Sequence, residues 1–148
     1  MARRFSKKKG LYTPSQIILS LLYLVGGCIR GRTRLENLLY LLQEKKGIDM
    51  GLKFYPGHFP YRSNEFEETL NILLGLGLIE ERHILIGKSK VAYTHKYLLT
   101  EEGETRAKNL VTRILDDQTK IIIKDVVDKW GKGVDTELKL IEYLANLD

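Results

Sequence analysis

Basic side chains that could bind phosphate are the first chemistry that this sequence suggests. Three arginines alternate at the start of an apolar, helix-like segment over residues 31–43: Arg30, Arg32 and Arg34. The helix dipole disfavours cations at that end, whereas the same end binds phosphates. The cluster therefore favours an external anion, with a phosphate backbone as the first candidate. The alternative is a solvated arginine cluster, which is common on protein surfaces.

Two further basic groups extend this interpretation. An arm over residues 1–12 is rich in Arg and Lys, and a turn of sequence Gly-Lys-Ser-Lys separates two strand-like segments. Asn64 is the one obvious base-reading side chain at the start of a later helix. The predicted nucleic-acid-binding residues are Arg3, Arg4, Lys7, Lys8, Lys9, Arg30, Arg32, Thr33, Arg34, Asn64, Lys88, Ser89, Lys90 and Lys96.

The placement of charge supports a polyanionic partner. The chain carries 24 Lys and Arg against 19 Asp and Glu, a formal net charge of +5. Eight of these cations precede residue 35 without any acid, so the rest of the chain is net acidic. A basic region on an acidic body is typical of a nucleic-acid partner, and we expect double-stranded DNA.

Catalytic motifs are not found. The sequence has neither the glycine-rich spacing of a phosphate-binding loop nor a Gly-x-Ser-x-Gly elbow. His58, His83 and His95 lie apart in sequence without the spacing of a zinc site. His83 and His95 could meet across the hairpin, but such a pair is more often structural. We therefore expect no enzyme, no catalytic or metal-binding residues and no cofactor.

The single cysteine fits a reducing compartment, and we expect a cytoplasmic protein. Cys28, between Gly27 and Ile29, is interpreted as a small core residue rather than a nucleophile. The basic start, the apolar run and the small residues before Cys28 superficially resemble a lipoprotein signal. Ser20 and Tyr23 interrupt that run, so we expect no membrane association.

Hydrophobic periodicity and capping residues predict the order of the elements. Thr13 and Pro14 begin a first helix that Gly26 ends, and Thr33 caps the second. Residues 48–62 show no helical period and hold a possible short strand at 52–55. The elements expected after this loop are a third helix capped by Ser63 or Asn64 and ended by Gly77, strands over 78–86 and 91–99, and helices beginning at Thr100, after Asp117 and at Asp135 or Thr136.

This order predicts a mostly α fold with a small β-hairpin. Three helices followed by a two-stranded wing make a winged helix-turn-helix over residues 13–115. Residues 116–148 form a C-terminal helical extension. Its apolar residues, among them Val126, Trp130 and Leu144, would either contact a second copy as a homodimer or cover the first helix.

The chain also resembles a known family. It is similar to the YwgA-like proteins and, more distantly, to the Panacea-type antitoxin domain. The residues that carry the resemblance are Gly31 to Leu35, Leu38 to Gln43, Tyr55, Pro60, Tyr61, Ser63, Leu73 and Gly77 to Ile79. Leu99 to Gly103 is like the strand-to-helix corner of winged-helix regulators. The chain departs from the family pattern at Glu36-Asn37 and by an extra residue near Pro60.

The third helix separates two hypotheses about function. Three carboxylates at its start, Glu65, Glu67 and Glu68, suit the helix dipole but would be repelled by DNA. The leading hypothesis is a DNA-binding regulator of transcription that contacts mainly phosphates. The alternative is a protein-interaction module, antitoxin-like or adaptor-like, that uses the third helix and the long loop.

Overall fold

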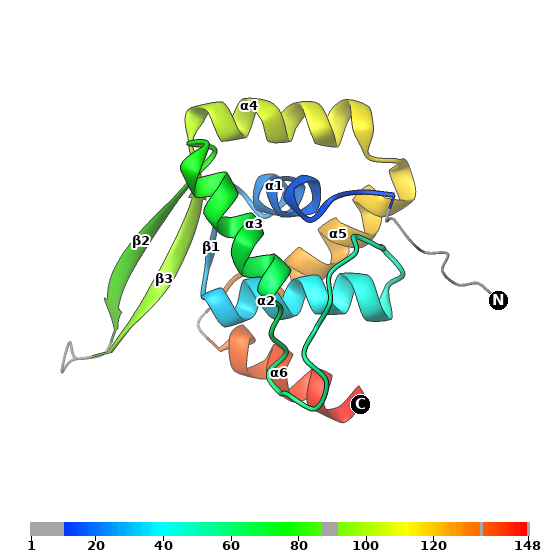
Figure 1. Ribbon diagram of the computed structural model, residues 1–148, viewed down its shortest axis with the longest axis vertical. Helices are drawn as coiled ribbons and strands as arrows, with labels where there is room; N and C mark the ends of the chain where they lie inside the picture. The colour runs from blue at the N-terminus through cyan, green and yellow to red at the C-terminus, as the bar shows by residue number, and fades with distance from the viewer. Residues whose placement is uncertain (1–10, 87–91, 134, 148) are drawn as a thin grey trace.

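The computed structural model describes residues 11–86, 92–133 and 135–147. This part of the chain is mostly helical with a small three-stranded antiparallel sheet (Figure 1). In chain order its elements are α1 (Pro14–Leu24), β1 (Cys28–Arg30), α2 (Arg32–Tyr40), η2 (Leu41–Lys45), α3 (Asn64–Gly75), β2 (Ile79–Ile86), β3 (Ala92–Leu99), α4 (Glu101–Asn109), η3 (Leu110–Ile114), α5 (Asp117–Trp130) and α6 (Thr136–Leu147).

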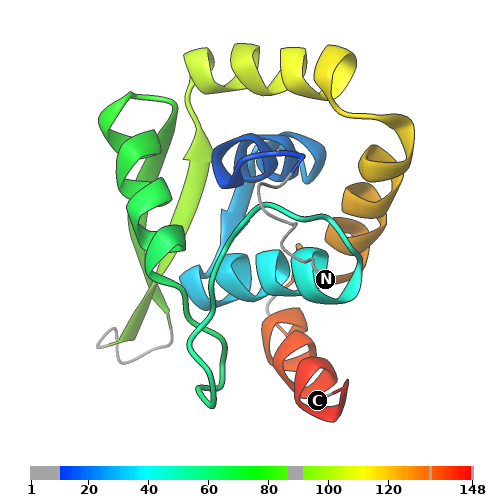
Figure 2. The ribbon, with the colours of Figure 1, turned by 45° about the vertical axis from the view of Figure 1, so that its right-hand side comes forward.

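Helix α1 lies at the centre of the molecule (Figure 2). Its start is the predicted one, because the Thr13 hydroxyl accepts the Gln16 N–H and the Gln16 side chain accepts the Thr13 N–H. Helices α3, α4 and α5 all contact it, as do strands β1 and β3. A helix that is apolar on most sides requires this covering.

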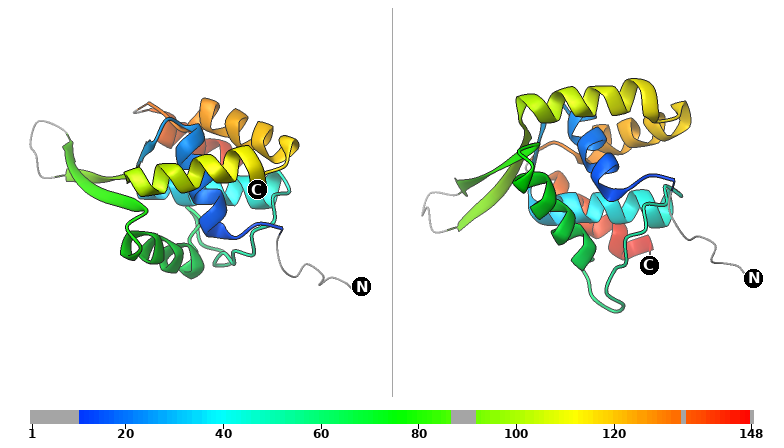
Figure 3. Two further views of the ribbon diagram at one scale, coloured as in Figure 1. Left: turned by 90° about the horizontal axis from the view of Figure 1, so that it is seen from above. Right: turned by 45° about the horizontal axis from the view of Figure 1, so that its top comes forward.

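The sheet has the strand order β1-β3-β2, and all its pairs are antiparallel. The β2–β3 hairpin projects from the helical body, with β1 beside it (Figure 3). The sequence did not predict β1, because three residues next to glycines are too few to show an alternating pattern. The prediction of a possible strand at residues 52–55 is wrong, since no strand is found there.

A sharp turn at Gly31 connects β1 to α2. Gly31 has φ +104°, its N–H donates to the His95 carbonyl at 2.7 Å, and its own carbonyl accepts the Leu35 N–H at 3.0 Å. Gly31 is therefore both the last partner of the sheet and the N-cap of α2. The prediction that Thr33 caps this helix is wrong, because Thr33 already lies inside its first turn.

Two residues of α2 hold the long loop that precedes α3. Glu36 accepts the Ser63 N–H at 2.7 Å and pairs with Arg62 at 3.4 Å. Asn37 binds both backbone polar groups of Tyr61, at 3.1 and 3.3 Å. Glu36 and Asn37 thus position the N-terminus of α3.

The C-terminal helices complete the core. Val126, Val127 and Leu144 are buried within the chain. The apolar residues on which we based a homodimer contact are thus largely buried within the chain: α5 covers α1, as in the covering alternative, whereas α6 packs mainly on α2 and α5. At the N-terminus of α5, the Tyr12 hydroxyl donates to the carboxylate of the N-cap residue Asp116 at 2.9 Å and accepts the Asp116 N–H at 3.0 Å.

The corner between β3 and α4 depends on Gly103. Thr100 caps α4 as predicted, by accepting the Gly103 N–H at 3.0 Å, and its hydroxyl donates to the Gly77 carbonyl at 2.6 Å. This brings Gly103 against the Leu78 backbone. A Cβ at Gly103 would overlap the Leu78 carbonyl oxygen, which also accepts the Thr100 N–H.

We predict that Gly103→Ala lowers the free energy of unfolding by about 3 kcal/mol or more, because backbone atoms at a corner cannot shift to relieve the overlap. Gly75→Ala is the matched control, since Gly75 is also helical and a Cβ there meets nothing within 4 Å. The control should stay within about 1 kcal/mol of the wild type, on the stabilising side. Urea unfolding followed by circular dichroism measures both; equal stabilities would contradict the close approach.

A second prediction concerns Glu36. Burial raises the pKa of this carboxyl above its ordinary value of 4.5, against the opposing effects of Ser63 and Arg62. The folded state then holds its proton to a higher pH than the unfolded state. The wild type should therefore lose stability relative to Glu36→Gln as the pH rises from about 4 towards 7. Urea unfolding of both proteins across this range tests the sign, and a growing wild-type advantage would contradict it.

Candidate functional site

The three alternating arginines make different contacts. Arg32 pairs with Glu67 of α3 at 3.2 Å, and its guanidinium lies 5.9 Å from the centre of the Phe66 ring. Arg34 points into the protein, and Arg30 belongs to β1 on the other side of the Gly31 turn. The Gly31 turn thus places Arg30 on a strand and Arg32 and Arg34 on a helix, while Arg30 and Arg34 both line one hollow.

Arg34 connects α2 to the segment between α5 and α6. Its side chain donates to the carbonyls of Trp130 at 3.1 Å and Gly133 at 2.6 Å, and to the Thr136 hydroxyl at 2.8 Å. Only 1% of the residue is exposed. Burial lowers the pKa of the guanidinium and the Glu137 carboxylate opposes this effect. Arg34 thus has a structural role, since its hydrogen bonds hold the segment between α5 and α6 against α2.

A row of cations crosses the outer face of the sheet. Arg30 of β1 lies opposite Lys96 of β3, and Lys96 lies opposite Arg82 of β2. Residues that are paired in an antiparallel sheet point to the same face. We call Arg30, Lys96 and Arg82 the cationic row. Arg30 and Lys96 were predicted binding residues, and Arg82 was missed because only the strand register relates it to them.

Two members of the row are close neighbours. The Gly31 N–H bonds to the His95 carbonyl, so the backbone polar groups of the next residue, Lys96, point to β2 and not to β1. Arg30 and Lys96 are thus a non-hydrogen-bonded pair, the arrangement in which opposite side chains lie closest. Like charges in such a pair are destabilising. A bound anion would remove this repulsion.

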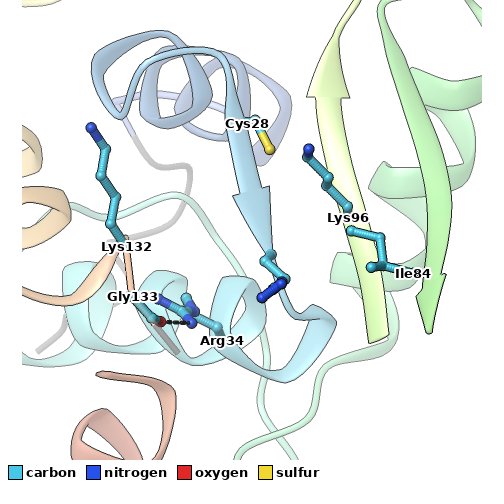
Figure 4. Close-up of a pocket in the computed structure, with 8 residues that line it drawn as sticks. Cys28, Arg34, Ile84, Lys96, Lys132 and Gly133 are labelled. Atoms are coloured by element: carbon cyan, nitrogen blue, oxygen red, sulfur yellow. Dashed lines mark hydrogen bonds between the residues drawn. The ribbon is translucent and has the colours of Figure 1, made fainter. Parts of the chain in front are cut away.

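A hollow of about 280 Å³ adjoins the row (Figure 4). Lys132 lies on one side of β1 and Lys96 on the other, and Cys28 points between them. Lys132, from the segment between α5 and α6, adds a cation that sequence reasoning missed. The side chains that line the hollow are Cys28, Arg30, Arg34, Ile84, Lys96 and Lys132.

Most of this positive charge makes no ion pair with the described part of the chain. Arg82 pairs with Glu80 at 3.0 Å. Within the described residues, no ion pair is made by Arg30, Lys96 or Lys132. The hollow therefore presents cations from three parts of the chain to solvent.

The start of α3 is occupied by internal contacts. Asn64 accepts the Tyr55 hydroxyl at 2.6 Å. Glu65 accepts the Lys53 N–H at 3.3 Å and the Ser63 hydroxyl at 3.1 Å. Asn64, the predicted base reader, thus holds the long loop, and the carboxylates leave this end of α3 acidic.

The opposite face of the hairpin carries a second group of side chains. His83 and His95 are paired across β2 and β3, and their rings lie 4.7 Å apart. The Glu81 carboxylate lies 2.6 Å from Nδ1 of His95 and accepts the Tyr97 hydroxyl at 3.1 Å. The structure brings together two histidines and a carboxylate that the sequence analysis did not combine.

The remaining predicted contacts lie outside the described residues. They are Arg3, Arg4, Lys7, Lys8 and Lys9 of the arm and Lys88, Ser89 and Lys90 of the turn.

The sequence matches no protein-family model and no curated protein. None of the helices in the described part of the chain has both the length and the apolarity that crossing a bilayer requires.

We predict that Arg34→Met lowers the free energy of unfolding by about 2–4 kcal/mol, because it removes three charge-assisted hydrogen bonds to the segment between α5 and α6. Arg113→Met is the matched control, since Arg113 is exposed at the end of η3. Urea unfolding compares the two. An equal loss in both variants would show that Arg34 does not hold the C-terminal helices.

Proposed function

We propose that this chain is a winged-helix protein that binds duplex DNA mainly through phosphates, as a cytoplasmic regulator of transcription. The observation that carries the proposal is the cationic row with Lys132. Arg30 and Lys96 face each other closely without an ion pair to the described residues, which costs folding energy unless an anion is bound. Phosphates are the anions that Arg and Lys bind along a duplex.

The arrangement of the elements supports the winged-helix part of the proposal. A helix, a short strand, two helices and a hairpin follow one another, and the first strand pairs with the second strand of the hairpin. The hairpin then takes the place of a wing. Its outer face carries Lys96 and Arg82 of the cationic row.

The arm would contact a separate stretch of DNA. The first described residues lie at the end of the molecule opposite the hairpin (Figures 1 and 3). The arm joins the described chain at this end, so its cations and those of the cationic row can contact different phosphates of one duplex. The arm and the cationic row should therefore contribute independently to affinity.

Helix α3 would contribute little to DNA binding. Its exposed Glu68 and its partly paired Glu67 would lie against phosphates if the helix entered a groove. Asn64 is bound to Tyr55 and would have to leave this contact to reach a base edge. We therefore expect affinity that is shared by all sequences and little discrimination among them.

We predict that the double variant Arg30→Gln/Lys96→Gln weakens binding to every duplex sequence alike. Each lost phosphate contact removes about one released counterion, so the slope of log affinity against log salt should fall by about two. Fluorescence anisotropy with a random duplex across a salt series measures affinity and slope together.

The matched control for this experiment is Lys108→Gln/Arg113→Gln. It removes the same two charges from exposed positions of α4 and η3, away from the sheet. It should keep the wild-type slope. If both double variants lose the same amount of affinity and slope, net charge and not the cationic row controls binding, and this site assignment fails.

An exposed apolar surface favours a protein-interaction module as the second candidate. Ile72 and Leu76 near the end of α3 are 57% and 62% exposed. A groove of about 290 Å³ lies here, and its apolar residues come from α1, the end of α3, the turn between α3 and β2, and the start of η3: Leu19, Leu73, Leu76, Leu78 and Leu110. Such a surface suits an amphipathic helix of a partner protein.

The variant Ile72→Ser/Leu76→Ser separates the two candidates. It should keep the wild-type duplex affinity if the protein acts on DNA through its sheet. The second candidate takes precedence if the wild type shows no affinity for duplex at low salt and binds a partner protein that this variant no longer binds.

A further inference from the structure

We propose that Glu81, His83 and His95 form a binding site for a transition-metal ion, Zn²⁺ first, on the face of the hairpin opposite the cationic row. Each residue offers one ligand atom, and these three atoms lie within 4.8 Å of one another. Two imidazoles and one carboxylate are a donor set that zinc uses when it keeps a position open for a further ligand. The proposal does not depend on DNA binding.

The strand register builds this cluster. The backbone polar groups of His95 point to β1, so His83 and His95 are a non-hydrogen-bonded pair whose side chains lie close together. Glu81 comes two residues before His83 on the same face and reaches His95 diagonally, at 2.6 Å. Ligands about 3.3–3.5 Å apart surround a tetrahedral zinc ion. The three ligand atoms lie within 4.8 Å of one another, so those that are farther apart than this spacing would have to move closer when an ion binds.

The surroundings suit a metal ion. Tyr97 is fully buried, and its hydroxyl donates to Glu81 Oε2, which fixes the orientation of the carboxylate. Hydrogen bonds of this kind orient the ligands of protein metal sites. His83 is exposed, and Glu81 and His95 are half-buried, so an ion can enter from solvent. The Glu81 carboxylate supplies a negative charge that partly balances that of a divalent cation.

Binding would connect the two strands of the hairpin through side chains. Glu81 and His83 belong to β2 and His95 to β3. An ion that binds the folded hairpin and not the unfolded chain stabilises the fold by mass action. The alternative is a structural group in which Glu81 and His95 share a proton and no ion binds.

The test is a titration of the untagged, metal-free full chain with ZnCl₂ by isothermal calorimetry, and with CoCl₂ by visible absorption. We expect one equivalent of zinc to bind, a cobalt spectrum typical of tetrahedral nitrogen and oxygen ligands, and a higher melting temperature with zinc. His83→Gln and Glu81→Gln should each weaken zinc binding by about 100-fold or more, since each removes a direct ligand of a three-residue site.

Two control variants make the result specific. His58→Gln removes a histidine of the long loop, and Cys28→Ser removes a thiol on the other face of the sheet, so both should bind zinc as the wild type does. Circular dichroism without metal checks that every variant is folded. Absence of zinc binding at about 100 µM, or equal weakening in His83→Gln and His58→Gln, overturns the proposal.

Discussion

Burial of α1 is the constraint on which the rest of the structure depends. Ile17, Ile18, Leu21 and Leu22 are completely buried, and even Ser20 has no exposed surface. Each large apolar side chain contributes about 1.5–3 kcal/mol when it leaves water, so this helix is stable only inside the protein. The surrounding helices and strands supply that cover, and the short connections between them must reverse direction around it. Gly31 and Gly103 lie at two of these reversals. At Gly103 the backbone of Leu78 is too close for a side chain, and at Gly31 the positive φ disfavours one.

The Gly31 turn also distributes charge. Because β1 ends and α2 begins within two residues, the side chains of Arg30, Arg32 and Arg34 point in different directions. Arg30 faces solvent on the sheet, Arg32 pairs with Glu67 of α3, and Arg34 is buried against the segment between α5 and α6. A sequence cluster of like charges thus becomes one candidate binding residue and two structural contacts. The buried arginine explains why the C-terminal helices belong to the same core as the rest of the chain.

The two faces of the hairpin carry different sets of side chains, because successive residues of a strand point to opposite faces. His95 and Lys96 are neighbours in sequence, so their side chains point to opposite faces of β3. The outer face gathers cations from three strands, and the other face gathers two imidazoles and a carboxylate around a buried tyrosine. If both proposals hold, an ion that connects β2 to β3 would also hold Arg82 and Lys96 in register, since the same strands carry both groups.

Local signals in the sequence were sufficient to predict where several helices begin. Helices α1, α3 and α4 begin at Thr13, Ser63 and Thr100 as predicted, because a capping side chain and its N–H lie within one turn. The candidate sites, by contrast, depend on contacts between residues that are far apart in the sequence. The cationic row and the Glu81 cluster need a strand register, and the place of Arg34 depends on residues about a hundred positions later. Such contacts leave no local periodicity, so the sequence could suggest the residue types but not which of them meet.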